Sequence, residues 1–105
     1  MLLGAKERAV NVMFADPHLS EAATLRPASG GEIAVRVMVR APDEVQSFGA
    51  VSLQSGTLIL HIRIADAEDL AADDVFDVRG QTRKVQGHPR RDSTGLIFEV
   101  NTVPV

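Results

Sequence analysis

The sequence contains no cysteine, no tryptophan and no tyrosine. Without cysteine the chain can form neither disulfides nor thiolate metal sites, so a reducing compartment suits it as well as any other. Its four phenylalanines make up 4% of the chain, which argues against the aromatic platforms that stack on bases or sugars. The formal net charge of -3 argues against general affinity for nucleic acid, because such affinity needs a basic surface.

Long apolar runs are absent too. No stretch approaches the ~20 apolar residues that a membrane-spanning helix needs, and Met1-Leu2-Leu3 is followed too soon by Lys6 and Glu7 to be a signal peptide. We therefore expect no contact with a membrane. With 105 residues, 45% of them hydrophobic and 24% charged, the chain has the size and composition of one globular domain, predicted to span residues 1–105.

What the sequence does have is rows of Val, Leu and Ile at alternate positions, clearest in residues 32–41 and 57–65. A two-residue period of this kind predicts half-buried strands. Turn residues separate these strands from their neighbours. The predicted fold is therefore mainly β, a small antiparallel barrel or sandwich of six or seven strands. The further strands are predicted at 24–27, 75–79, 82–86 and 95–103, with a short one at 50–53.

Two helical segments are predicted beside the strands. Leu3, Val10 and Phe14 recur at helical spacing, which indicates a short N-terminal helix over residues 3–14. Because this helix is too short to be stable alone, we expect residues 1–16 to be a mobile arm unless they dock.

The second helical segment is about one turn in residues 66–71, with Asp66 as its N-cap. Residues 43–56 are rich in small and polar side chains and are predicted to form an extended loop.

The sequence contains no pattern that indicates a catalytic site or a metal site. His18, His61 and His88 lie far apart and lack the spacing of a zinc site. The acidic residues in 66–74 lack the ligand spacing, the central glycine and the terminal glutamate of a calcium loop. No nucleophile motif, phosphate loop or dinucleotide fingerprint appears. We therefore expect no enzyme activity, no metal and no cofactor.

Basic residues in 79–91 follow the acidic residues in 66–74. Two interpretations stay open. Both segments can be solvated loops, as most runs of charge are. Alternatively, the acidic flank of one copy meets the basic flank of the next, and such head-to-tail contacts close into a ring.

The order and spacing of several segments resemble a known family. Residues 39–45 (VRAPDEV) are followed by Gly49, Gly56 and the strand at 58–64. The acidic turn 66–69, residues 74–80 (DVFDVRG), residues 85–87 (VQG) and a final strand come next. Over residues 14–104 this order resembles the lambda-type head–tail joining proteins of long-tailed phages.

The resemblance implies a compact β domain, without catalytic activity or cofactor, that assembles as a ring of six copies on the portal or adaptor at the neck of the virion. Such a ring helps to retain the packaged DNA, without reading its sequence, and provides the surface to which the tail docks. The protein is then made in the cytoplasm of the bacterial host. A tail terminator or another tail subunit is the first alternative, and a small cellular ligand-binding barrel is a weaker one.

The resemblance also implies an N-terminal arm and a long inter-strand loop that become ordered on assembly. Together with the charged flanks, the loop supplies the predicted contact residues. They are Asp43, Glu44, Gln46 and Phe48 in the loop, Asp69 and Asp73 in the acidic flank, and Arg83, Lys84, Arg90 and Arg91 in the basic flank.

Overall fold

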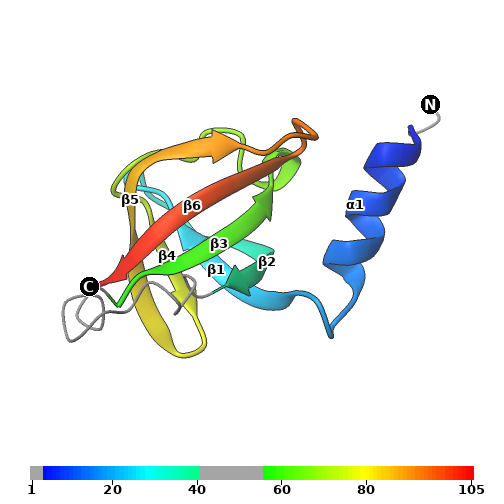
Figure 1. Cartoon of the computed structure of the whole chain (residues 1–105). Helices are drawn as coiled ribbons and strands as arrows, with labels where there is room; N and C mark the ends of the chain where they lie inside the picture. The colour runs from blue at the N-terminus through cyan, green and yellow to red at the C-terminus, as the bar shows by residue number, and fades with distance from the viewer. Residues whose placement is uncertain (1–3, 41–55) are drawn as a thin grey trace, which may run out of the picture.

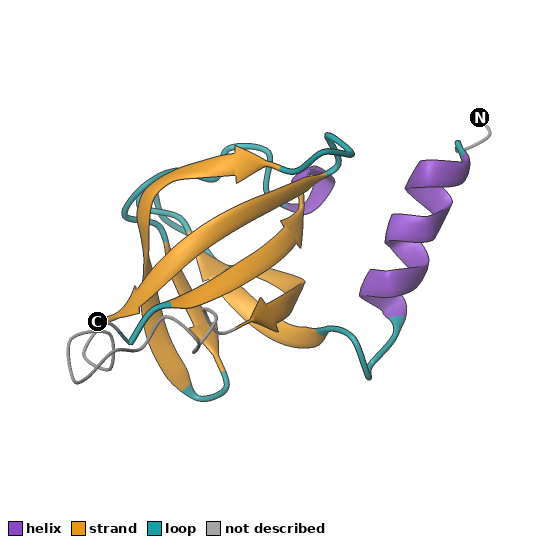
Figure 2. Cartoon of the chain, viewed as in Figure 1, coloured by secondary structure: helices purple, strands orange, loops and turns teal. Residues whose placement is uncertain are grey.

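The computed structural model describes residues 4–40 and 56–105, and within them six antiparallel strands close into a barrel (Figure 1, Figure 2). Each strand hydrogen-bonds to the next in the order β1-β2-β3-β6-β5-β4. The predicted mainly-β antiparallel barrel is confirmed. The strands are β1 (Glu21–Arg26), β2 (Ile33–Arg40), β3 (Leu58–Arg63), β4 (Val75–Val78), β5 (Gln81–Arg91) and β6 (Ile97–Pro104).

Alternate residues of the strands fill the barrel. Val37, Leu60 and Ile62 are fully buried, and their neighbours along β2 and β3 point outward and are partly or wholly exposed. Thirteen buried residues form this core, and Val39 and Ile64 pack against it. The alternation of apolar and polar residues is therefore the feature of the sequence that closes the sheet around one apolar interior.

The connection between β4 and β5 shows how the turns fit the strands. Val78 and Gln81 pair directly, so only Arg79 and Gly80 lie between the strands. Both have positive φ, 55° and 72°, as a type I′ turn requires. β1 and β2, which follow each other along the chain, also pair antiparallel.

A helix, α1 (Ala5–Ala15), precedes the barrel and confirms the predicted N-terminal helix. Gly4 caps it, and the backbone N–H of Gly4 donates to Glu7 Oε1 at 3.1 Å. The helix stands beside the barrel rather than within it (Figure 1), and the molecule measures 51 Å along its longest axis.

The strand predicted at 82–86 ends too early, because β5 continues through Arg91. The pairing of β5 with β6 shifts between Gln86, which faces Asn101, and Arg90, which faces Glu99. Three residues of β5 therefore lie opposite one residue of β6, which is a large bulge. Gly87 and Pro89 lie in this bulge. Because both residue types are common where strands end, the sequence predicted an end to the strand here.

The predicted short helical turn is present, but it begins two residues before the predicted range of 66–71. A 3-10 turn, η3 (Ile64–Asp66), begins directly after β3, and Asp66 is its last residue rather than an N-cap. Ala67 and Leu70 are 5% and 8% exposed, so the chain after η3 crosses the end of the barrel to bury them. Burial of these two side chains overrides the local capping preference. The predicted strand at 50–53 lies outside the described residues, as does the predicted loop except for Gly56.

Candidate interaction surface

A small apolar cluster docks α1 against the barrel. Val10 and Phe14 of the helix are 5% and 1% exposed and pack with Ile97 of β6. Met13, Met38 and Leu96 pack around them. The N-terminal segment therefore meets the condition under which we expected it to be ordered, because it has a docking site of its own.

A polar latch holds the connection between α1 and β1. Ser20 is 4% exposed, and its hydroxyl donates to the carbonyl of Phe14 at 2.6 Å. Arg36 of β2 donates from Nε to Ser20 Oγ at 2.8 Å and from Nη2 to the Ser20 carbonyl at 2.7 Å. These charge-assisted bonds fix the C-terminal end of the helix on the outer face of the sheet.

Arg63, at the end of β3, is the second link between barrel and helix. Its Nε donates to Asp66 Oδ2 at 2.8 Å, and its Nη1 donates to Asn11 Oδ1 of α1 at 3.2 Å. The guanidinium carbon also lies 5.8 Å from the centroid of the Phe14 ring, within the range of a cation–π contact. Arg63 thus positions α1 by its polar and its aromatic contacts at once.

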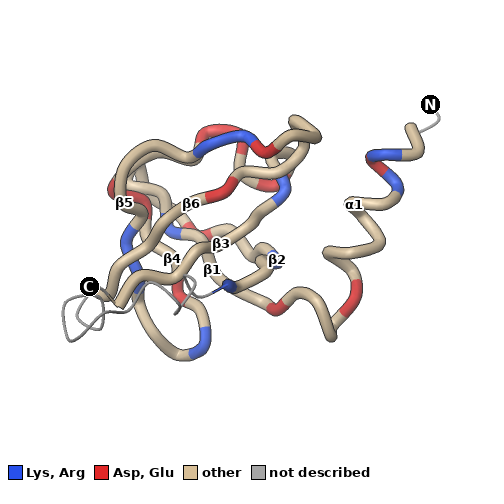
Figure 3. Tube along the Cα trace, viewed as in Figure 1, with Lys and Arg blue, Asp and Glu red and all other residues tan. Residues whose placement is uncertain are grey.

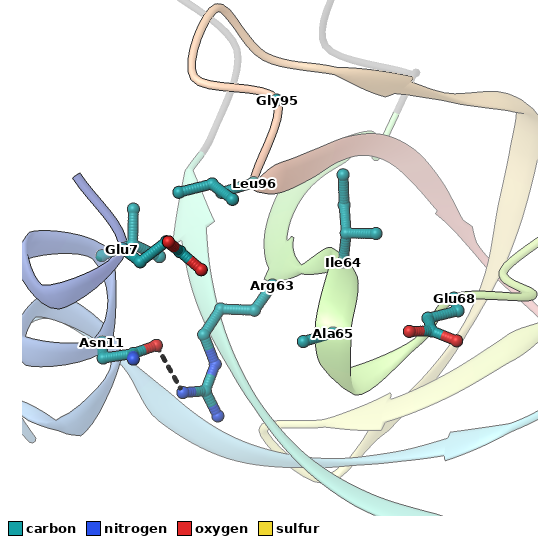
Figure 4. Close-up of a pocket in the computed structure, with 9 residues that line it drawn as sticks. Glu7, Asn11, Arg63, Ile64, Ala65, Glu68, Gly95 and Leu96 are labelled. Carbon is teal, nitrogen blue, oxygen red and sulfur yellow. Dashed lines mark hydrogen bonds between the residues drawn. The ribbon is translucent and has the colours of Figure 1, made fainter. Parts of the chain in front are cut away.

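Between α1 and the barrel a groove of about 340 Å³ remains open (Figure 4). Val10, Ile64 and Leu96 line it with apolar side chains. The Asn11–Arg63 hydrogen bond joins the helix to the barrel near one end of the groove (Figure 4). Glu7 from the helix and Glu68 from the barrel also line it. The described surface therefore carries an apolar groove with a carboxylate on each side.

Arg83 lies inside the barrel and not on a basic flank. The residue is 2% exposed, and its Nε donates to Thr102 Oγ1 at 2.8 Å. Further bonds run to the side chain of Gln81 and to the carbonyls of Gly56 and Thr102. These acceptors are neutral, and burial lowers the pKa of Arg83. The guanidinium is used within the chain, so we leave Arg83 out of the contact surface.

The acidic and basic residues of the predicted flanks are interspersed on the barrel rather than separated (Figure 3). Lys84 Nζ lies 3.8 Å from Asp73 Oδ1 in an exposed pair within one chain. Asp69 is exposed on the segment that crosses the end of the barrel. An exposed ion pair contributes little to stability, about 0–1 kcal/mol, so Lys84 and Asp73 remain available to a partner.

Glu99 is the centre of a charged network on the outer face of the barrel. Arg90 donates to Glu99 Oε1 at 2.7 Å, and Arg40 lies 3.8 Å from Oε2. His61 Nε2 is buried and lies 3.3 Å from Oε2 without forming a hydrogen bond within the described residues. Arg91, the other predicted basic contact, is exposed and stands over the Phe98 ring at 5.7 Å.

The Glu99 network predicts a loss of stability in acid. The hydrogen bond from Arg90 is the main cause that holds the pKa of Glu99 below its ordinary value of 4.5. Because folding favours the carboxylate, its contribution is present above the unfolded-state pKa and disappears as the pH falls through the lower folded-state pKa. In urea unfolding, Glu99→Gln should be less stable than the parent at about pH 7, and the gap should be smaller at a pH well below the ordinary glutamate pKa of 4.5. An equal gap at both pH values would contradict this account of the network.

Asp43, Glu44, Gln46 and Phe48 lie outside the described residues, so the structure does not place them. Within residues 4–40 and 56–105, no group of three or more His, Asp or Glu side chains is arranged to hold a metal ion. Among the same residues no helix has the length and apolar character needed to span a membrane.

The apolar contacts on the outer face of the sheet were not predicted from the sequence. Met38 and Ile97 occupy outward positions on β2 and β6, yet they pack against α1. The signal was available, because an apolar residue on the polar face of a strand indicates a second layer of packing. Arg63 and Arg36 carried no signal of their own, since arginine on an outer strand face is ordinary.

Comparison with known proteins identifies the family. A family model described as phage head–tail attachment protein matches residues 4–102, which include α1 and all six strands up to Thr102. The solution structure of protein SF1141 from Shigella flexneri 2a is similar with a TM-score of 0.56 and 17% identity, over 82% of this chain and 92% of that one. At this identity the likeness shows the fold alone. No curated protein matches the chain. The chain therefore belongs to the family of phage head–tail attachment proteins, which are structural joining proteins of the virion.

Proposed function

We propose that this chain joins the DNA-filled head to the tail by assembling as a ring, of six copies, on the portal or adaptor at the phage neck. The match of nearly the whole chain to the head–tail attachment family carries the proposal. In this role the ring retains the packaged DNA without reading its sequence and presents the surface on which the tail docks. The subunit is made in the cytoplasm of the bacterial host and acts without enzymatic chemistry or cofactor.

The closed barrel favours contacts with partner subunits through side chains rather than through backbone strand pairing. Each strand of the closed barrel already pairs with a strand on either side, so adding a strand from a partner is not the favoured mode. The available surfaces are the groove beside α1, the loops at the barrel ends and the exposed charges. From the predicted set, the described candidates are Asp69, Asp73, Lys84, Arg90 and Arg91, and the loop residues Asp43, Glu44, Gln46 and Phe48 remain part of the proposal.

Sedimentation of the purified chain, alone and with the portal or adaptor ring, tests the assembly step. We expect a monomer on its own, because each contact between copies is weak until a partner ring presents several sites together. With the ring present, the chain should sediment with it and saturate at a fixed ratio of copies. If the chain still sedimented as a monomer when mixed with the portal ring and when mixed with the adaptor ring, the result would contradict assembly at the neck.

A further inference from the structure

A second groove, larger than the one beside α1, lies at an end of the barrel. It has a volume of about 770 Å³ and runs between the β1–β2 connection, at residues 27–30, and the segment 65–72 that follows β3. Leu25 and Leu70 line it and are themselves buried. Ile33 lines it too and is 41% exposed. This end groove therefore leaves apolar surface open to a partner.

Asp74 joins the two walls of the end groove. It is buried, and its Oδ1 accepts from the backbone N–H of Ala28 at 2.9 Å, in the β1–β2 connection. Its Oδ2 accepts from the backbone N–H of Ala71 at 3.0 Å, in the segment that crosses the end of the barrel. Both oxygens of this carboxylate are used within the chain, and their charge-assisted bonds hold the walls at a set spacing. The end groove is therefore a built part of the folded domain.

Two other carboxylates at the end groove have no such use. Glu68 and Asp69 line the groove and are exposed, and within the part of the chain that the structure describes neither side chain forms a hydrogen bond or an ion pair. The segment 64–74 that carries them contains five Asp or Glu residues and no Lys or Arg. Because like charges that lie close together repel, the end groove has an excess of negative charge that a cation from outside would relieve.

The chemistry of the end groove favours a partner of another sequence over a second copy of this chain. Several arginines of this chain already meet acceptors in their own subunit, because Arg79 binds Glu21, Arg83 binds Thr102 and Arg90 binds Glu99. A second copy would have to break such a contact to offer one of these cations. A lysine or arginine suits the groove, because its aliphatic stem packs on apolar walls while its charged head reaches a carboxylate.

We propose that the end groove docks a segment of another neck protein in which a lysine or arginine stands next to an aliphatic side chain. This docking surface rests on the proposed joining function and names the face through which the subunit contacts its neighbour. The aliphatic side chain packs on Ile33 and Leu70, and the cation lies beside Glu68 and Asp69. The apolar walls supply affinity, and the negative charge sets the register and the rate of encounter.

Charge reversal at two side chains that the fold does not use tests the docking. The double variant E68K/D69K should be at least as stable as the parent in urea unfolding, because the change removes repulsion within the segment 64–74. In a phage that lacks this gene and receives it from a plasmid, the variant should nevertheless lower the yield of infectious particles about a hundredfold. Suppressor mutations should then replace a lysine or arginine with an acidic residue in a portal, adaptor or tail gene.

Glu32→Lys is the matched control, because it reverses an exposed carboxylate that does not line the end groove. It should keep the yield within about threefold of the parent. Ile33→Thr tests the apolar wall and should lower the yield about tenfold.

Three results would overturn the docking surface and leave the joining function standing. They are a normal yield from E68K/D69K, a loss of stability in that variant that matches its loss of yield, and suppressors that arise only in this gene, which would show that the contact joins two copies of the chain. If virions form normally without the gene, the joining function itself is wrong.

Discussion

Replacing Phe14 with alanine is expected to release α1 from the barrel while the barrel stays folded. Phe14 is 1% exposed and is the largest side chain in the cluster that docks the helix. Burial of a phenylalanine contributes about 2–3 kcal/mol, and the truncation also removes the ring under Arg63. A free helix of this length is marginal in water, so undocking should be followed by unfolding of the helix.

Amide hydrogen exchange is the measurement that separates the two parts of the molecule. In Phe14→Ala the amides of α1 should exchange about a hundredfold faster, whereas those of β3 and β6 should keep their protection. Trypsin should cut faster after Lys6 or Arg8 in the same variant. Val12→Ala is the matched control on the same helix, because Val12 is 68% exposed and should leave exchange unchanged. Unchanged protection of α1 in Phe14→Ala would contradict the docking role of Phe14.

Replacing Phe76 with alanine should instead destabilise the whole barrel. Phe76 is fully buried in β4 and packs in the main core, where no neighbouring element can move away on its own. Truncation of a buried phenylalanine costs about 3–5 kcal/mol, a large share of the roughly 5–15 kcal/mol that a domain has. We therefore expect a single, cooperative transition at a much lower urea concentration.

Phe76→Leu is the control for that experiment, because it keeps the site apolar and removes less volume. It should cost about 1–1.5 kcal/mol. If Phe76→Ala lost stability only in the amides of β4, or lost no more than Phe76→Leu, the barrel would not be the single cooperative unit described above.

The sequence predicted the barrel well because its strands follow the simplest rule. Residues of β2 and β3 alternate between the apolar interior and the outer face, and a two-residue period is visible without any knowledge of partners. It predicted the extent of β5 and the position of η3 poorly. A bulge that contains Gly87 and Pro89 interrupts the local pattern, and burial of Ala67 and Leu70 depends on contacts made across the end of the barrel. Neither can be read from a short window of sequence.

The exposure of the predicted contact residues was predictable only in part. Arg90 and Arg91 are exposed as expected, but Arg83, seven residues before Arg90 in the same strand, turns inward and binds Thr102. Charge alone does not say which face of a strand a long side chain occupies, and here the two basic residues next to each other, Arg83 and Lys84, lie on opposite faces. The groove needed the structure, because it is built by α1 together with residues more than fifty positions further along the chain.

Electron microscopy of a lysate from a phage that lacks this gene tests the joining function most directly. The account predicts DNA-filled heads and complete tails that remain separate, and virions that form when the purified chain is added back. Normal virions in the absence of the gene, or heads that fail before they are filled with DNA, would contradict it.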